Sequence, residues 1–260
     1  MTTGTNWVDL DGVVNMRDLG GHTTADGRTV RSAVVLRSDN LAGLTPASVS
    51  RLMSDYHLSD VVDLRTNMEH AHDGVWPFGE RVELHKMSLY PEDDPSSLVP
   101  PWHGELGDTA PANEPGDHAH ASARHYLGYF RMRPDSLVGT LRTVAGAQGA
   151  TIINCAAGKD RTGVACALLL TCLGVPADQV IADYAASDAK VPAILARLGL
   201  AATAGSPEHR EAVAAQATPP EAMALLLERV ATELGGVPAW LAAHGWQPDD
   251  QIALEARLLA

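Results

Sequence analysis

One ten-residue stretch, NCAAGKDRTG at residues 154–163, constrains the fold more than any other part of the sequence. It lies directly between the β-branched run at residues 151–153 and the apolar stretch at residues 164–173. The first pattern is typical of a buried strand and the second of a buried helix, which predicts a loop that joins a strand to the amino end of a helix. Such a junction binds anions, because the amides of the first helical turn have no partner inside the helix and the helix dipole is positive there.

The side chains of this stretch suit a phosphate ester. Residues 156–158 are small, so successive peptide amides can turn toward one dianion. The same positive field favours the thiolate of Cys155, which predicts a nucleophile. Arg161 can hold two phosphoryl oxygens with its planar guanidinium, and Thr162 can donate its hydroxyl to the thiolate when it leaves. We call residues 155–162 the phosphate loop; its predicted phosphate-binding residues are Ala156, Ala157, Gly158, Lys159, Asp160, Arg161 and Thr162, and no metal or other cofactor is needed.

The remaining patterns predict one α/β domain over residues 1–260. Strands are expected at 32–39, 59–66, 81–89 and 149–155, and a helix that begins at Thr45-Pro46 joins the first two. After the phosphate loop the pattern is helical at about 161–173, 176–198, 218–234, 237–244 and 248–259, so the part from about 176 to 260 is expected to be helical. The expected fold is a central, mostly parallel sheet of four or five strands flanked by helices.

A long insertion separates the third and fourth of these strands. Residues 90–117 are rich in proline and glycine, and a helical pattern follows. An irregular segment of this length in a compact domain is typical of a functional lid, which predicts a lid-like insertion over about residues 90–133. For RHYLGYFRM at 124–132, two interpretations stay open: a lid helix that offers Tyr126, Tyr129 and Phe130 to the substrate, or a plain core helix.

Composition narrows the classes of partner and compartment. Apolar residues make up 45% of the chain, enough for a full core, and the formal net charge of −13 argues against nucleic acid and anionic membranes as general partners. The three cysteines, Cys155, Cys166 and Cys172, have no disulfide-framework spacing, which favours a reducing compartment. Cys166 and Cys172 are expected in the core, with a protective disulfide to Cys155 as the alternative. With no signal sequence or spanning segment in view, the prediction is a cytoplasmic protein, with export by a route without a signal left open.

The phosphate loop resembles the Cys-x5-Arg loop of the cysteine-dependent phosphatases. The longer string from Cys155 to Gly163 resembles the bacterial tyrosine phosphatase family within that group. NMRDLGG at 15–21 resembles the Asn-Phe-Arg-Asp-Leu-Gly-Gly of that family, and VLRSDNL, VVDLRT and GGVPAWLAAHGW are weaker matches. The resemblance spans about residues 12–259.

The resemblance implies a role for each matching residue. Cys155 is the implied nucleophile and Arg161 the phosphate ligand, while Lys159 and Asp160 match a pair associated with phosphotyrosine, phosphoserine or phosphothreonine, and phosphoinositide substrates. Asp63 in VVDLRT matches the proposed general acid, with Asp160 as the competing candidate. An ion pair of Asp63 with Arg65 or Arg17 is the structural alternative to catalysis.

One position departs from the family. Asn154 replaces the histidine that normally precedes the cysteine; it can keep a hydrogen bond to the loop but adds no titratable positive charge. Several histidine pairs, such as His70 with His72 and His118 with His120, are interpreted as solvated side chains rather than metal ligands.

The sequence thus predicts a metal-independent protein tyrosine phosphatase, that is, a phosphomonoesterase with a phosphocysteine intermediate. Phosphoserine, phosphothreonine and phosphoinositides are further expected substrates, so the expected partners are phosphorylated proteins, phosphoinositides or small phosphate esters. Two alternatives stay open: a phosphatase of a small phosphorylated metabolite, and a phosphate-binding protein with little turnover.

Overall fold

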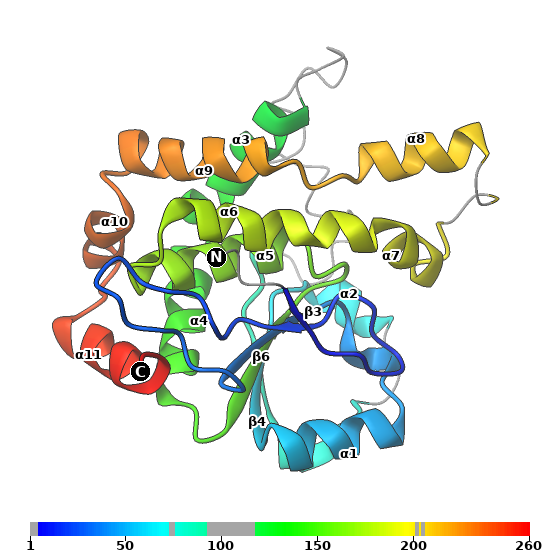
Figure 1. Ribbon diagram of the computed structural model, residues 1–260, viewed down its shortest axis with the longest axis horizontal. Helices are drawn as coiled ribbons and strands as arrows, with labels where there is room; N and C mark the ends of the chain where they lie inside the picture. Colours follow the sequence, from blue (N-terminus) through cyan, green and yellow to red (C-terminus); the bar gives the residue numbers. More distant parts are fainter. Residues whose placement is uncertain (1–4, 73–75, 93–117, 201–202, 204–205) are drawn as a thin grey trace.

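The computed structural model describes residues 5–72, 76–92, 118–200, 203 and 206–260, and these residues build one six-stranded mixed sheet with helices on both faces (Figure 1). The strand order is β1-β2-β3-β6-β4-β5. The four strands from β3 to β5 are parallel neighbours, while β1 and β2 are antiparallel additions at one edge. The strands are β1 (Asn6–Trp7), β2 (Arg17–Asp18), β3 (Val35–Ser38), β4 (Leu58–Asp63), β5 (Glu83–Lys86) and β6 (Ala150–Asn154).

The expected α/β fold with a mostly parallel sheet is confirmed, and the sheet is wider than the four or five strands predicted. All four predicted strands are present. The additional β1 and β2 are two residues each, too short to give an alternating pattern in the sequence.

The sheet has a hydrophobic core on each of its two faces, and neighbouring side chains of the central strands belong to different cores. In β6, Ile153 joins the larger core under the C-terminal helices, and Ile152 joins the smaller core under α1. Val62 and Val61 of β4 divide between the two cores in the same way. Because successive side chains of a strand point to opposite faces, two apolar neighbours are buried on both sides only when helices cover both.

The predicted helices are all present, but the structure has two further helices, Asn67–Ala71 and Pro134–Gly146, for which the sequence made no prediction. Two other differences lie in the C-terminal part. The predicted helix over 176–198 is divided by a 3₁₀ segment, Ala186–Lys190, whose Ser187 is fully buried and hydrogen-bonded to the segment around Asn15. An additional helix occupies part of 201–218, a stretch for which the sequence made no prediction. The helices are α1 (Pro46–Asp55), α2 (Asn67–Ala71), α3 (His118–Met132), α4 (Pro134–Gly146), α5 (Asp160–Cys172), α6 (Ala177–Ala185), α7 (Val191–Arg197), α8 (Pro207–Ala215), α9 (Pro220–Glu233), α10 (Val237–Ala243) and α11 (Pro248–Leu258).

Most of the predicted lid lies outside the described residues, which resume at His118 with α3. This helix is a core helix: it packs on α9, and Phe130 lies edge to face against Trp240 with ring centroids 4.9 Å apart. Tyr126, Tyr129 and Phe130 are all at most 3% exposed. The burial of these aromatic side chains agrees with the core-helix interpretation of 124–132. The lid-like insertion over about residues 90–133 stays a prediction.

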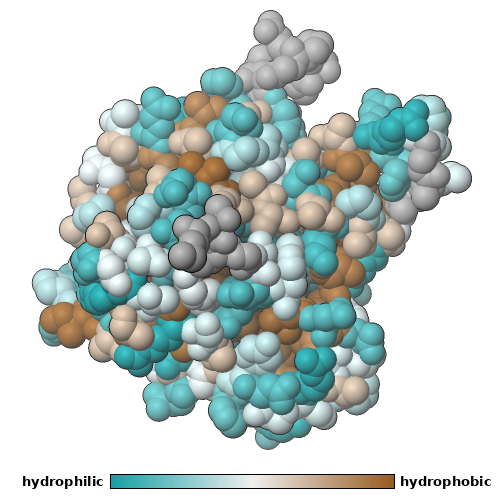
Figure 2. Space-filling model, in the orientation of Figure 1, coloured by the Kyte–Doolittle hydropathy of each residue, from teal (hydrophilic) through white to brown (hydrophobic). Residues whose placement is uncertain are grey.

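Polar side chains cover much of the one face of the molecule seen in Figure 2. Figure 2 shows hydrophilic and intermediate residues over most of the visible face, with smaller hydrophobic patches between them. Among the described helices, none combines the length and the hydropathy that crossing a bilayer requires.

Candidate active site

The phosphate loop connects β6 to α5, as the sequence predicted. Cys155 directly follows β6, and α5 begins at Asp160. Gly158 has a φ of +68°, and a Cβ at this position would lie 2.5 Å from the backbone nitrogen of Asp39. Only glycine satisfies both the left-handed backbone and the close approach to the end of β3.

The carbonyl oxygens of the loop are bound from outside it. The Asn15 side-chain amide donates to the Ala157 carbonyl at 3.0 Å, an Arg37 terminal nitrogen donates to that of Gly158 at 2.8 Å, and the Asn40 amide donates to that of Ala156 at 3.1 Å. In the described part of the chain, no group accepts a hydrogen bond from the peptide N–H groups of residues 156–159. The loop therefore keeps its acceptors occupied and its donors available, which is the arrangement that binds an anion.

A buried ion network holds the arginine beneath the loop. Asp183 of α6 accepts from Arg17 of β2 at 2.8 Å and also from Arg37 of β3. Burial raises the pKa of Asp183, but the two guanidinium groups outweigh it and hold that pKa well below its ordinary value. Arg17, which the sequence offered as a possible partner of Asp63, pairs with Asp183 instead. The sequence did not single out Arg37 or Asp183, because Asp183 lies 146 residues from Arg37 in an ordinary helical pattern.

Arg161 is oriented by a residue that the sequence analysis did not identify. Its two terminal nitrogens each donate to one carboxylate oxygen of Glu69 at 2.7 Å, and its guanidinium carbon lies 5.3 Å from the centroid of the Tyr90 ring. Burial lowers the pKa of Arg161, but the hydrogen bonds to Glu69 together with the negative charges of Cys155 and Glu69 outweigh burial and raise it well above the ordinary value. The one signal in the sequence was the capping box of α2, in which Thr66 and Glu69 bind each other's backbone amide.

The two candidate acids differ in exposure and in partners. Asp63 ends β4, is 1% exposed, and binds Arg65 through both carboxylate oxygens, at 3.0 Å to Nε and 2.7 Å to Nη2. This is the ion pair that the sequence analysis kept as the alternative to catalysis. Asp160 begins α5, and its side chain is 34% exposed.

Asp160 accepts from two neighbours. The Tyr126 hydroxyl donates at 2.5 Å and the Lys159 ammonium lies 2.9 Å away. Burial raises the pKa of Asp160, but the positive charge of Lys159 and the hydrogen bond from Tyr126 outweigh it and hold the pKa below the ordinary value. Lys159, which we expected to offer its charge to substrate, is itself buried and paired with Asp160.

Two polar side chains, one directly before the phosphate loop and one within it, make no hydrogen bond to a described group. The side-chain amide of Asn154 is buried and, among the residues that the structure describes, has no hydrogen-bond partner, so the expected bond to the loop is absent. The reason is that Asn154 is still part of β6, where Ser38 and Asp63 are its neighbours on the adjacent strands, and its side chain is fully buried against the sheet. The Thr162 hydroxyl is likewise buried and bonds to none of the described groups, the Cys155 sulfur included.

The cysteines are free thiols, and burial raises the pKa of Cys166 and of Cys172 to about 12. This agrees with their prediction as core residues. Over the described ranges, one group of three side chains could ligate a metal: Asp60 of β4 with Glu83 and His85 of the neighbouring β5. None of the three belongs to the phosphate loop.

Comparison with known proteins agrees with this geometry. A family model described as "Tyrosine phosphatase family" matches residues 8–260. The chain belongs to the tyrosine phosphatase family. A candidate tyrosine-protein phosphatase of Cupriavidus necator is 34% identical over 181 residues, which cover 69% of this chain and 62% of that relative. The triple specificity protein phosphatase PtpB of Mycobacterium tuberculosis is 29% identical over 206 residues, which cover 73% of this chain and 72% of the relative.

Proposed function

We propose that this member of the tyrosine phosphatase family is a metal-independent phosphomonoesterase that works through a phosphocysteine intermediate. The observation that carries the proposal is the loop itself: Cys155 at its base, peptide donors at 156–159 that bond to none of the described groups, and Arg161 held in place by Glu69. Glu69 occupies the end of the guanidinium formed by its two terminal nitrogens. The edge that carries Nε stays available for two phosphoryl oxygens.

The reaction follows from these positions. The Cys155 thiolate attacks phosphorus, forming an S–P bond as the ester P–O bond breaks, and a carboxylic acid gives its proton to the leaving oxygen. Water then attacks the phosphocysteine, its proton passes to the same carboxylate, and the S–P bond breaks to return the thiolate and inorganic phosphate. The amides and Arg161 stabilise the charge on the phosphoryl oxygens in both steps.

We assign the acid and base role to Asp160 rather than to Asp63. The burial of Asp63 and its pairing with Arg65 support this choice, as does the exposure of Asp160 at the loop. A bound phosphate dianion opposes the lowering of the pKa of Asp160 by Lys159, because a nearby negative charge favours the protonated carboxyl. The hydroxyl of Tyr126 keeps the carboxyl oriented.

The proposed substrates are phosphotyrosine in proteins first, then phosphoserine or phosphothreonine and phosphoinositides. The name of the Mycobacterium tuberculosis relative, a triple specificity phosphatase, supports this range. The three free thiols support a reducing compartment such as the cytoplasm, and the family match over residues 8–260 supports a single domain.

The first test is burst-phase hydrolysis of an aryl phosphate with a chelator present, comparing wild type with Cys155→Ser. We expect a burst that the chelator leaves unchanged and that the serine variant loses. Turnover abolished by the chelator would refute the metal-independent mechanism. Binding of vanadate without any turnover would favour the phosphate-binding protein, and a strong preference for free phosphorylated metabolites over phosphopeptides would favour the metabolite phosphatase.

A further inference from the structure

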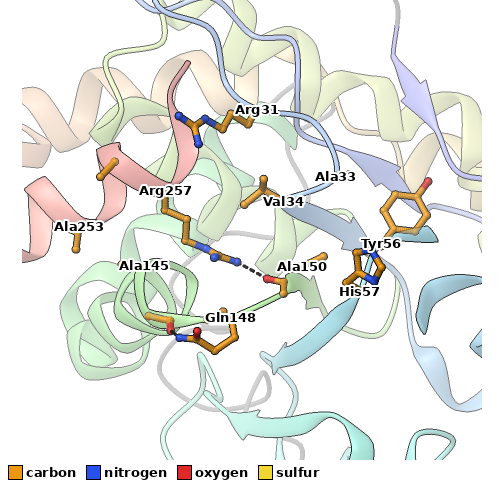
Figure 3. Close-up of a pocket in the computed structure, with 14 residues that line it drawn as sticks. Arg31, Ala33, Val34, Tyr56, His57, Ala145, Gln148, Ala150, Ala253 and Arg257 are labelled. Atoms are coloured by element: carbon orange, nitrogen blue, oxygen red, sulfur yellow. Dashed lines mark hydrogen bonds between the residues drawn. The ribbon is translucent and has the colours of Figure 1, made fainter. Parts of the chain in front are cut away.

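A second concave site lies at the end of the sheet opposite to Cys155 (Figure 3). It has a volume of about 590 Å³, within the range of small-molecule sites. Four segments line it: residues 31–34, the end of the α1 region at Tyr56 and His57, the turn before β6 at 145–150, and α11 through Ala253, Ala256 and Arg257. Ala150 begins β6 here, and Cys155 follows the other end of that strand, so the two sites are separated by the length of β6.

The charge of this pocket contrasts with that of the molecule. Arg31 and Arg257 line it, together with His57, in a chain whose formal net charge is −13. Within the described ranges, neither arginine lies within ion-pair distance of a carboxylate. Two arginines outside the pocket do form ion pairs. Arg28 pairs with Glu255 of α11 at 2.7 Å, and Arg142 pairs with Asp250 of α11 at 2.8 Å. Two carboxylates of α11, Glu255 and Asp250, are thus bound to arginines outside the pocket.

Arg257 is held in the pocket with part of its hydrogen-bonding capacity unused. One terminal nitrogen donates to the Gly149 carbonyl, as the dashed line in Figure 3 shows. Its Nε is buried and has no partner among the described residues, and burial lowers the pKa of the guanidinium despite the favourable charge of Asp60. The second terminal nitrogen of Arg257 donates to none of the described groups, so its N–H donors can bind an anion in the pocket.

The walls leave room for the body of a ligand. Eight of the fourteen lining residues are alanine or glycine, at 33, 145–147, 149, 150, 253 and 256, and Tyr56 contributes an aromatic ring. In Figure 3, Tyr56 and His57 lie across the pocket from Arg257, with Ala150 between them and Arg31 along the rim. Gly149 cannot be enlarged, because a Cβ there would lie 1.8 Å from the His57 carbonyl oxygen.

We propose that this pocket binds a small organic anion, a carboxylate or phosphate attached to a flat apolar body. Arg257 and Arg31 bind the anionic group, and the body packs between Tyr56 and the small residues of the 145–150 turn. This site is separate from the phosphate loop and does not depend on the proposed catalytic activity.

Titration calorimetry with 2-naphthoate tests the proposal, with 2-naphthamide as its neutral match. We expect Arg257→Met to raise the Kd for 2-naphthoate at least tenfold and Arg31→Met at least threefold, and we expect the amide to bind at least tenfold more weakly than the acid. The exposed Arg51, which pairs with Asp55 on α1, does not line the pocket, so Arg51→Met is the matched control and should leave the Kd unchanged. Because Arg31 is exposed, its variant keeps the test valid even if Arg257→Met fails to fold.

A second experiment distinguishes binding in this pocket from binding at the phosphate loop. In an Arg161→Met background, binding of 2-naphthoate should persist, and comparison with 2-naphthylphosphonate in the same background identifies the preferred anionic group. Equal Kd values in wild type, Arg31→Met and Arg257→Met would overturn the proposal. So would equal binding of acid and amide, loss of binding in Arg161→Met, or no binding by wild type.

Discussion

At the residue scale, the arrangement around Arg161 depends on Glu69. A carboxylate that takes both terminal nitrogens of a guanidinium fixes its plane, and this pair is 15% and 10% exposed at the two side chains, so water competes little. Burial raises the pKa of Glu69, but the hydrogen bonds and positive charge of Arg161, together with the hydrogen bonds from Thr66, outweigh burial and hold the pKa below its ordinary value. Glu69 is therefore a positioning residue that acts through Arg161.

We predict that Glu69→Gln lowers kcat/KM for an aryl phosphate by roughly 10- to 100-fold, because the amide offers one acceptor in place of two charged oxygens. Steady-state kinetics and vanadate inhibition measure the effect. The exposed Glu83 on β5 provides the control, and Glu83→Gln should behave as wild type. Faster turnover in Glu69→Gln would mean that Glu69 competes with phosphate for Arg161, contrary to this prediction.

The choice between the two acids is also tested at single residues. Because an alkoxide is a far poorer leaving group than a phenolate, loss of the general acid slows an alkyl phosphate more than an aryl phosphate. We expect Asp160→Asn to slow a phosphoserine peptide about 10- to 100-fold more than an aryl phosphate. Asp63→Asn should slow both substrates by the same factor. The opposite pattern would make Asp63 the acid.

At the element scale, the β6–loop–α5 unit depends on its fit against β3. Gly158 makes this contact, and its added Cβ would meet the backbone at Ser38 and Asp39, which cannot move without shifting the strand. Gly174, after the end of α5, also has a positive φ, of +80°, but no atom lies within 4 Å of its added Cβ.

We therefore predict that Gly158→Ala reduces kcat/KM at least 100-fold, while Gly174→Ala leaves it within twofold of wild type. Each variant carries the left-handed strain of about 1 kcal/mol, so both should lose a similar small amount of stability from the backbone alone. Kinetics together with urea unfolding separate the two effects. Comparable activity of the two variants would show that the approach to β3 is not what shapes the loop.

At the scale of the whole molecule, Asp183 connects α6 to β2, β3 and, through Arg37, to the phosphate loop. Since its pKa is depressed in the folded protein, the unfolded chain takes up a proton more readily. The stability that Asp183 contributes is thus fully present above the ordinary carboxyl pKa, about 3.9, and is lost as the pH falls toward the folded value.

Asp183→Asn should lower the free energy of unfolding by about 3–5 kcal/mol at pH 7, because it leaves two buried guanidinium groups without their counter-charge. The difference in the free energy of unfolding between the variant and wild type should shrink below about pH 4, where the stability contributed by ionised Asp183 begins to be lost. Urea unfolding from pH 3 to pH 7 measures both. Asp178→Asn, at an exposed position of the same helix, should show neither effect, and a pH-independent difference for Asp183→Asn would contradict the assigned ion network.

The sequence by itself determined what depends on neighbours in the chain. Cys155, the small residues after it and Arg161 stand within one loop, and the turn from strand to helix follows from the apolar runs on either side. The four central strands and the helix that begins at Pro46 were likewise visible as local periodicities and caps.

The tertiary structure alone decided which distant side chains serve that loop. Glu69 lies 92 residues from Arg161 and Tyr126 lies 34 residues from Asp160, and nothing in their local patterns distinguishes them from capping or core residues. The break in the predicted helix over 176–198 and the burial of the Asn154 side chain likewise required the packed strands and helices. The physical reason is that periodicity and capping report hydrogen bonds within a few residues, whereas an ion pair between separate elements forms only after the order of strands has brought their ends together.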